Sequence, residues 1–136
     1  MKALYPPLSY AIFTALSIAA LLAIMTVLNV FTDNIQKNYA RAQLDMTSEM
    51  IRNEILKLYS TNAEGKFKLE IPNDIAGRQY TIELSQKYLN LSITVRNEKI
   101  ETYRFVNISA TMSGESYAPA SIEIERTEGN TLVRLV

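Results

Sequence analysis

The sequence of 136 residues contains neither cysteine nor histidine. Disulfide bonds, thiolate nucleophiles, imidazole bases and zinc sites built from these residues are therefore all excluded. Serine is present, but without histidine and without a G-x-S-x-G turn it cannot form the familiar hydrolytic triads. The four glycines are scattered along the chain, so no glycine-rich phosphate loop occurs. We expect neither an enzyme nor a bound metal ion or other cofactor.

An excess of charge of either sign is also lacking. Lysine and arginine number 14, and aspartate and glutamate number 14, which gives a formal net charge of zero. Because the basic residues are dispersed among acidic ones, the chain offers no electrostatic footprint for nucleic acid. The charges are unevenly placed, however, since the 30 residues between Lys2 and Asp33 contain none.

This uncharged stretch is long enough to cross a membrane. Its centre, YAIFTALSIAALLAIMTVLNVF, covers residues 10–31. As a helix it would reach about 33 Å, against a hydrocarbon core of about 30 Å. A cleaved secretory signal usually has a shorter apolar region, and the roughly 75 residues of the C-terminal domain are too few to surround such a helix in a soluble domain. We expect a transmembrane helix over residues 4–32, with the C-terminal part outside the cell because positive charge precedes the helix at Lys2.

The helix is expected to continue through residues 33–60, which contain no glycine or proline. At 100° per residue, its apolar side chains fall on two stripes on nearly opposite sides. One stripe consists of Ile35, Tyr39, Ala42, Met46 and Met50, and the other of Leu44, Ile51, Ile55 and Leu58. Either a small domain buries both faces at different heights, or one stripe contacts a neighbouring copy of the protein.

Residues 61–136 change to the alternating pattern of β-strands. Six short strands are expected, in KFKLEI, QYTIEL, YLNLSITV, KIETYRFVNI, SIEIER and TLVRLV. Turn residues such as Asn97-Glu98 separate them and favour antiparallel pairing. Residues 110–120, ATMSGESYAPA, are expected to form the one long loop, either a spacer or a functional element. The fold class is therefore α+β, with a long N-terminal helix followed by a small antiparallel β head.

A head of this size has a thin core, so the second half of the helix should pack across one face of the sheet. Alternation predicts a set of core residues in the sheet: Phe67, Leu69, Ile71, Tyr80, Ile82, Leu91, Ile93, Val95, Phe105, Ile122 and Ile124. The helix residues expected to face them are Leu44, Ile51, Ile55 and Leu58.

Two N-x-S sequons suit an external head. They are Asn90-Leu91-Ser92 and Asn107-Ile108-Ser109, which makes Asn90 and Asn107 candidate N-glycosylation sites. Such triplets are frequent by chance, so they agree with the orientation without proving it.

The start of the chain and its overall layout resemble type IV pilins, especially the archaeal branch. The Met-Lys-Ala-Leu start is similar to the site at which prepilin peptidases cut archaeal pilins and archaellins. The resemblance implies cleavage between Ala3 and Leu4, a leader of residues 1–3, and an early Pro6 in the mature chain. The leader is shorter than usual, and the helix lacks the early acidic residue of bacterial pilins, which archaeal members also commonly lack. The stretch IPNDIAGRQYTIEL, residues 71–84, is similar to a segment of archaeal pilin-like membrane proteins whose role is unassigned.

The resemblance implies a structural subunit of a cell-surface filament with a role in adhesion, assembled from copies of this chain. Small residues along the membrane helix would allow helices to approach closely, namely Ala11, Ala15, Ala19 and Ala23. Ile35, Tyr39 and Met46 would extend this helix contact beyond the membrane. The alternative is a non-polymerising single-pass anchor, a minor pilin or a stator-like accessory protein, whose external β domain binds another envelope or appendage protein.

Overall fold

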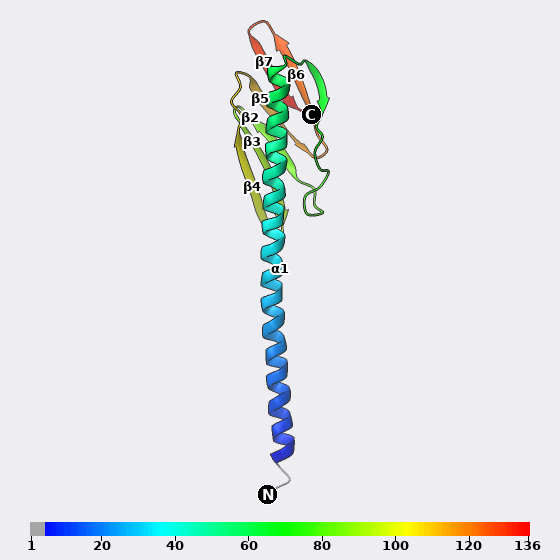
Figure 1. Cartoon of the computed structure of the whole chain (residues 1–136), viewed down its shortest axis with the longest axis vertical. Helices are drawn as coiled ribbons and strands as arrows, with labels where there is room; N and C mark the ends of the chain where they lie inside the picture. The colour runs from blue at the N-terminus through cyan, green and yellow to red at the C-terminus, as the bar shows by residue number, and fades with distance from the viewer. Residues whose placement is uncertain (1–4) are drawn as a thin grey trace. The chain divides into compact units, whose positions relative to one another are not determined.

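One helix, α1 (Tyr5–Ser60), precedes all the strands in the computed structural model, which describes residues 5–136 (Figure 1). Its two prolines, Pro6 and Pro7, lie in the first turn, where the missing N–H groups have no partner within the helix. Its 56 residues confirm the predicted continuous helix. The helix ends at Ser60, and Asn62, two residues later, has a left-handed φ of 53°. The Ala63 N–H donates to the Leu58 carbonyl at 3.1 Å, which closes the C-terminal turn.

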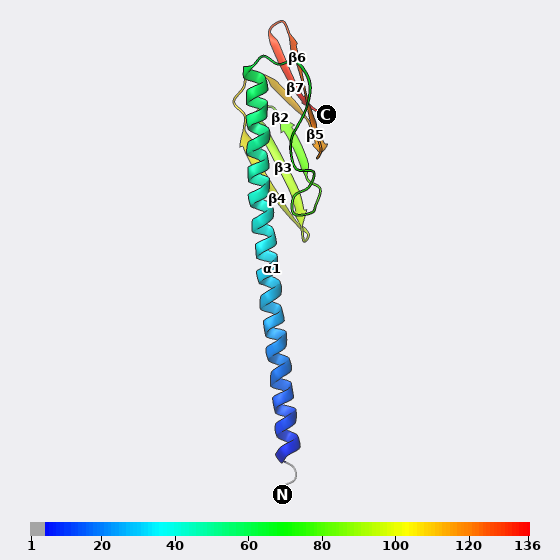
Figure 2. The same cartoon turned by 45° about the vertical axis from the view of Figure 1, so that its right-hand side comes forward.

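The protein divides into two units. The first is the helix up to Ile35, and the second is Gln36–Val136. The second half of α1 therefore belongs to the same unit as the sheet. Within this second unit, α1 crosses one face of the sheet (Figures 1 and 2).

The sheet contains seven strands in the order β1-β6-β7-β5-β2-β3-β4. Their bounds are β1 (Gly65–Lys68), β2 (Thr81–Ser85), β3 (Tyr88–Val95), β4 (Glu98–Phe105), β5 (Thr111–Tyr117), β6 (Ser121–Thr127) and β7 (Asn130–Leu135). All neighbours are antiparallel except β5 and β7, which are parallel. The α+β class is confirmed, while the expectation of purely antiparallel pairing is wrong for this one pair.

The expected loop over residues 110–120 contains a strand, β5, which lies in the middle of the sheet between β7 and β2. Its inward positions are Met112, Gly114 and Ser116, so only one large apolar side chain marks the strand. Gly114 has a φ of +125°, and a Cβ there would lie 2.7 Å from the Leu135 carbonyl oxygen. Close contact with β7 thus requires a small residue at this inward position. Glycine there interrupts the alternation of apolar and polar residues from which a strand is predicted.

Two other strand boundaries also differ from expectation. The first strand ends at Lys68 rather than at Ile71. The turn between β3 and β4 consists of Arg96 and Asn97, with φ of 48° and 64°, rather than Asn97-Glu98. Two central residues with positive φ define the hairpin turn whose twist matches that of paired strands.

The core lies between α1 and the inward face of the sheet. Most of the predicted sheet residues are buried there: Leu69, Tyr80, Ile82, Leu91, Ile93, Val95, Ile122 and Ile124. Phe67 and Ile71 are only partly buried at its edge. Small or short side chains of α1, Ala40, Thr47 and Ser48, are also fully or nearly fully buried, which brings the helix backbone close to the sheet.

Phe105 contradicts the prediction, because its side chain is 49% exposed. In β4 the inward positions are occupied by Ile100, Thr102 and Arg104, which places Phe105 on the opposite face. The same alternation continues after the strand, where Val106 and Ile108 are buried. The prediction is wrong because it assigned Phe105 to the core by residue type, whereas its position in this alternation places it outward.

Candidate assembly surface

The first unit presents its apolar side chains outward along the whole helix. α1 is long and apolar enough to cross a membrane by length and composition. The hydroxyl groups of Thr14, Ser17, Thr26 and Thr32 each donate to the carbonyl four residues earlier at 2.8 Å. These polar groups are therefore satisfied within the helix, as a lipid environment requires.

The small residues proposed for helix contacts lie on this exposed surface. Ala11, Ala15, Ala19 and Ala23 follow one another at four-residue intervals and are all exposed. Residues at this spacing form a ridge along a helix, and a ridge of alanines leaves a shallow strip on which another helix can pack closely.

In the second unit, one side of α1 is buried against the sheet. Leu44, Ile51 and Ile55 have no exposed surface, and Leu58 is 8% exposed. We call these four residues the inward face. The structure places all of them in the core with the sheet residues they were expected to contact.

The opposite side of α1 carries apolar residues that the described part of the chain leaves exposed. We call Ile35, Tyr39, Ala42, Met46 and Met50 the outward stripe. Met46 is 69% exposed, Tyr39 56%, Ile35 51% and Met50 48%. The two predicted stripes therefore have different environments, and the alternative in which the domain buries both does not hold.

A line of polar contacts along β4 fixes the rotation of the helix. The Thr102 hydroxyl donates to Asp45 Oδ1 at 2.6 Å, and Arg104 reaches the same oxygen at 3.2 Å. Arg104 also pairs with Glu49 at 3.3 Å, and Arg52 donates to the Phe105 carbonyl at 3.1 Å. Rotation of α1 that turned its outward stripe towards the sheet would break these hydrogen bonds and ion pairs.

A second group of polar contacts joins α1 to the β3–β4 turn. Lys37 forms an ion pair and hydrogen bond with Glu98, and this contact lowers the pKa of the Glu98 carboxyl. Arg96 in the turn donates to the Gln36 side chain at 3.4 Å. These contacts tie the first turns of the second unit's helix to the tip of the hairpin.

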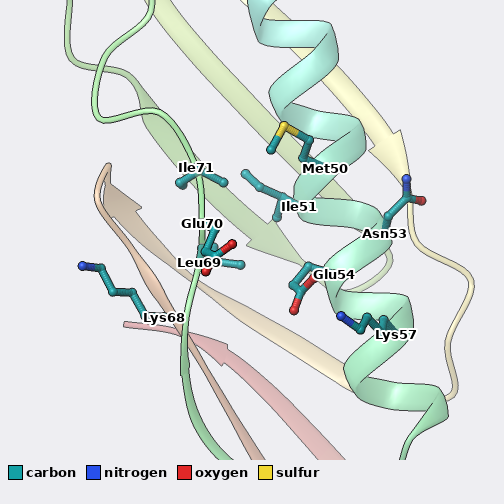
Figure 3. Close-up of a pocket in the computed structure, with 9 residues that line it drawn as sticks. All are labelled: Met50, Ile51, Asn53, Glu54, Lys57, Lys68, Leu69, Glu70 and Ile71. Atoms are coloured by element: carbon teal, nitrogen blue, oxygen red, sulfur yellow. The ribbon is translucent and has the colours of Figure 1, made fainter.

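A groove lies on the other side of α1 (Figure 3). It has a volume of about 500 Å³ and is open to solvent. Its lining consists of Met50, Ile51, Asn53, Glu54, Lys57, Lys68, Leu69, Glu70 and Ile71. Ile51 and Leu69 form a buried apolar floor. The helix side carries Glu54 and Lys57 and the opposite side carries Lys68 and Glu70, so the lining has no net charge. Met50 belongs to both the groove and the outward stripe, which makes the two surfaces continuous.

The segment between β1 and β2 contributes buried side chains to the core. Ile75 is fully buried, and the Ala76 N–H donates to the Gln43 side chain at 3.0 Å. The Tyr80 hydroxyl donates to the Pro72 carbonyl at 2.7 Å. Burial of Tyr80, together with the negative charge of Asp74, raises the pKa of this phenol to about 12.

The outer face of the sheet carries aromatic residues that the sequence analysis did not identify as a surface feature. Tyr88, Tyr103, Phe105 and Tyr117 are each 49–61% exposed. Tyr88 and Phe105 form an edge-to-face pair with ring centroids 5.6 Å apart. The alternation along each strand could have revealed this surface, because these aromatic residues occupy outward positions between buried ones.

The remaining predicted sites fall in different settings. Ala3 and Leu4, the expected cleavage site, lie outside the described residues. Asn107 is exposed in the loop after β4, whereas Asn90 is partly buried in the middle of β3. Within residues 5–136, no three or more acidic side chains gather closely enough to hold a metal ion.

The fold and these surfaces define an α+β protein with one N-terminal helix of membrane-spanning length. The chain belongs to a family of unknown function, DUF7266, whose model matches residues 2–136. No curated protein and no solved structure gives a significant match to the chain.

Proposed function

We propose that this protein is a structural subunit of an archaeal type IV pilus-like surface filament, assembled through its N-terminal helices with the β head outside. The observation that carries this proposal is the outward stripe, which lies on α1 opposite the inward face. A helix that packs on a single sheet needs one apolar face, so a second one calls for another partner.

The energetics favour burial of the outward stripe in a helix bundle. Full burial of a large apolar side chain contributes about 1.5–3 kcal/mol. Tyr39, Met46 and Met50 are about half exposed or more, so contact with a neighbouring helix would remove much apolar surface from water. In the uncharged first part of α1, lipid contacts would be exchanged for helix contacts, and the alanine ridge permits close packing there.

The predicted assembly is open rather than closed. If the outward stripe of one copy contacts a different surface of the next, the contact is heterologous and repeats without limit unless the rotation closes a ring. The outward stripe and the groove are continuous at Met50, so one neighbour can cover both surfaces.

The second candidate is a non-polymerising anchor whose external β domain binds another envelope protein. The exposed aromatic residues on the outer sheet face favour it, since tyrosine is enriched at protein interfaces. That face is on the side of the sheet away from α1, so it would be available whether or not the helices assemble.

A pair of substitutions tests filament assembly. Met46→Asp places a charge in the centre of the outward stripe, whereas Asn34→Asp places the same charge at an exposed position about 120° around the helix from Met46. We expect Met46→Asp to reduce the filaments recovered by surface shearing at least tenfold, while Asn34→Asp retains them. Circular dichroism of both purified variants shows whether the head remains folded. Normal filament yield from a folded Met46→Asp protein would contradict assembly through this stripe.

A further inference from the structure

The two N-x-S sequons of the chain differ sharply in their surroundings. Asn90 lies in the middle of β3, which is paired on both sides by β2 and β4. Its Oδ1 is buried, and its Nδ2 group is directed to Glu83 at 3.5 Å. The pKa of the nearby Glu101 carboxyl is lowered chiefly by its hydrogen bond with Lys99, and Asn90 makes the smallest contribution. The amide nitrogen that would accept a sugar is thus engaged within the sheet.

Asn107 is presented to solvent instead. It is exposed, while its neighbours Val106 and Ile108 are buried and hold the loop against the core. The Ile108 N–H donates to the Val106 carbonyl at 3.1 Å, so Asn107 occupies the tip of a tight three-residue turn. Its side chain makes no hydrogen bond to another described residue, and Ser109, which completes the sequon, is exposed as well.

An exposed aromatic ring lies next to this turn. Phe105 precedes Asn107 by two residues, and exposed and buried positions alternate from Phe105 to Ile108. Phe105 and Asn107 are therefore both exposed, one on each side of the buried Val106. The edge-to-face contact with Tyr88 holds the Phe105 ring in place, with about half of its surface uncovered.

We propose that Asn107, and not Asn90, is an N-glycan acceptor of the folded protein, and that Phe105 receives the first sugar on its exposed ring. The donor is a saccharide carried on a lipid phosphate or diphosphate. Nδ2 of Asn107 forms a bond to C1 of the sugar and loses a proton to the transferring enzyme. The bond between C1 and the phosphate oxygen breaks, and the lipid phosphate leaves with the electron pair.

The position of Phe105 gives the glycan a structural effect. The C–H groups on one face of a pyranose ring can pack on an aromatic face, and the sugar would cover apolar surface that the head itself leaves in water. In the cell the modification rests on the external placement of the head in the proposed function.

The acceptor assignment is tested outside the cell so that it does not depend on orientation. The full chain in detergent is incubated with a purified oligosaccharyltransferase and a polyprenyl-diphosphate-linked oligosaccharide, and its mass is measured. Two matched pairs, Asn107→Gln with Asn90→Gln and Ser109→Ala with Ser92→Ala, identify the acceptor. Synthetic peptides that contain each sequon show that the enzyme accepts both sequences when they are unfolded.

We expect one glycan on the wild-type chain, retained in Asn90→Gln and Ser92→Ala and lost in Asn107→Gln and Ser109→Ala. Modification of Asn90, or of neither site while both peptides are modified, would overturn the acceptor assignment. The glycan should raise Tm by about 2–5 °C, and this rise should disappear in Phe105→Ala, which removes a half-exposed side chain outside the core. An equal rise in Phe105→Ala would overturn the role of the ring. A chain modified in detergent but exposed only to the cytoplasm in cells, as measured by protease protection, would contradict the proposed function and leave the acceptor assignment standing.

Discussion

The hydroxyl group of Thr102 on β4 donates a hydrogen bond of 2.6 Å to the Asp45 carboxylate on α1. Thr102 is 8% exposed, so its hydroxyl depends on this partner. Asp45 lies on the flank of the helix between the inward face and the outward stripe. The pair therefore helps to determine which side of α1 is covered by the sheet and which side is left for other contacts.

Loss of this hydrogen bond should destabilise the head. Thr102→Val keeps the shape of the side chain but removes the donor, and we expect it to lower the free energy of unfolding by about 1–1.5 kcal/mol. Thr94→Val on the exposed face of β3 makes the same chemical change without a buried partner and should have an effect of less than about 0.5 kcal/mol. Urea unfolding of the sheet, followed by circular dichroism in detergent, measures both. Equal effects would show that the Asp45 contact contributes nothing specific.

Gly114 should be the least replaceable glycine. Gly114→Ala places a Cβ 2.7 Å from the Leu135 carbonyl oxygen and 2.9 Å from the Leu135 nitrogen, at a φ of +125°. Because backbone atoms cannot move aside cheaply, we expect a loss of more than about 2 kcal/mol. Gly129→Ala has the positive φ but no atom within 4 Å, so only backbone strain applies, at about 1 kcal/mol. Thermal unfolding of the two variants compares them, and a smaller loss for Gly114→Ala would contradict the close packing of β5 on β7.

Tyr80 should make the stability of the head sensitive to alkaline pH. Its pKa is raised to about 12 in the folded protein because the phenol is buried near Asp74. An acid whose folded pKa is raised favours folding below the unfolded value of about 10 and loses that contribution as pH rises towards the folded value.

The variant Tyr80→Phe isolates this effect from the titration of other groups. At pH 7 it should be less stable than the wild type by about 1 kcal/mol, because the hydrogen bond to the Pro72 carbonyl is lost. Between pH 10 and 12 the difference should shrink and then reverse, since only the wild type must ionise or retain a buried phenol. A difference that stays constant across this range of pH would refute the assignment.

The pKa of Glu98 should depend on Lys37. The hydrogen bond and charge of Lys37 lower it in the folded protein. In Lys37→Met we expect the Glu98 carboxyl pKa to rise towards its ordinary value, which carbon-detected NMR titration measures directly. A lowered folded pKa stabilises the head above the unfolded value and loses that effect as pH falls. An unchanged Glu98 titration in the variant would mean that the two side chains do not pair in solution.

The helical part of the protein follows from the sequence to a large extent. Periodicity alone separates Leu44, Ile51 and Ile55 from Tyr39 and Met46, because a helix maps sequence spacing directly onto direction. What it cannot supply is the environment of each stripe. Both stripes show the same apolar spacing in the sequence, so only the tertiary structure shows which one the sheet covers and which one is exposed.

The sheet is less predictable because strand identity depends on contacts distant in the sequence. β5 lacks a run of large apolar residues, since Gly114 must fit against the backbone of Leu135. For β5 a partner in another element therefore decides the outcome, and the local sequence carries no signal of it. Phe105 has the residue type of a core position but faces outward, and here the alternation of Ile100, Val106 and Ile108 was an available signal. Arg104 takes the inward place next to Phe105 and reaches Asp45 and Glu49.

A filament subunit of the proposed kind is processed at its N-terminus and assembled at the cell surface. The decisive experiment is intact-mass and N-terminal analysis of native protein from the sheared surface fraction and the membrane fraction. We expect the protein to lack residues 1–3 and to be recovered in the sheared fraction. An intact N-terminus on protein confined to the membrane fraction would contradict it and identify the chain as an anchored interaction domain.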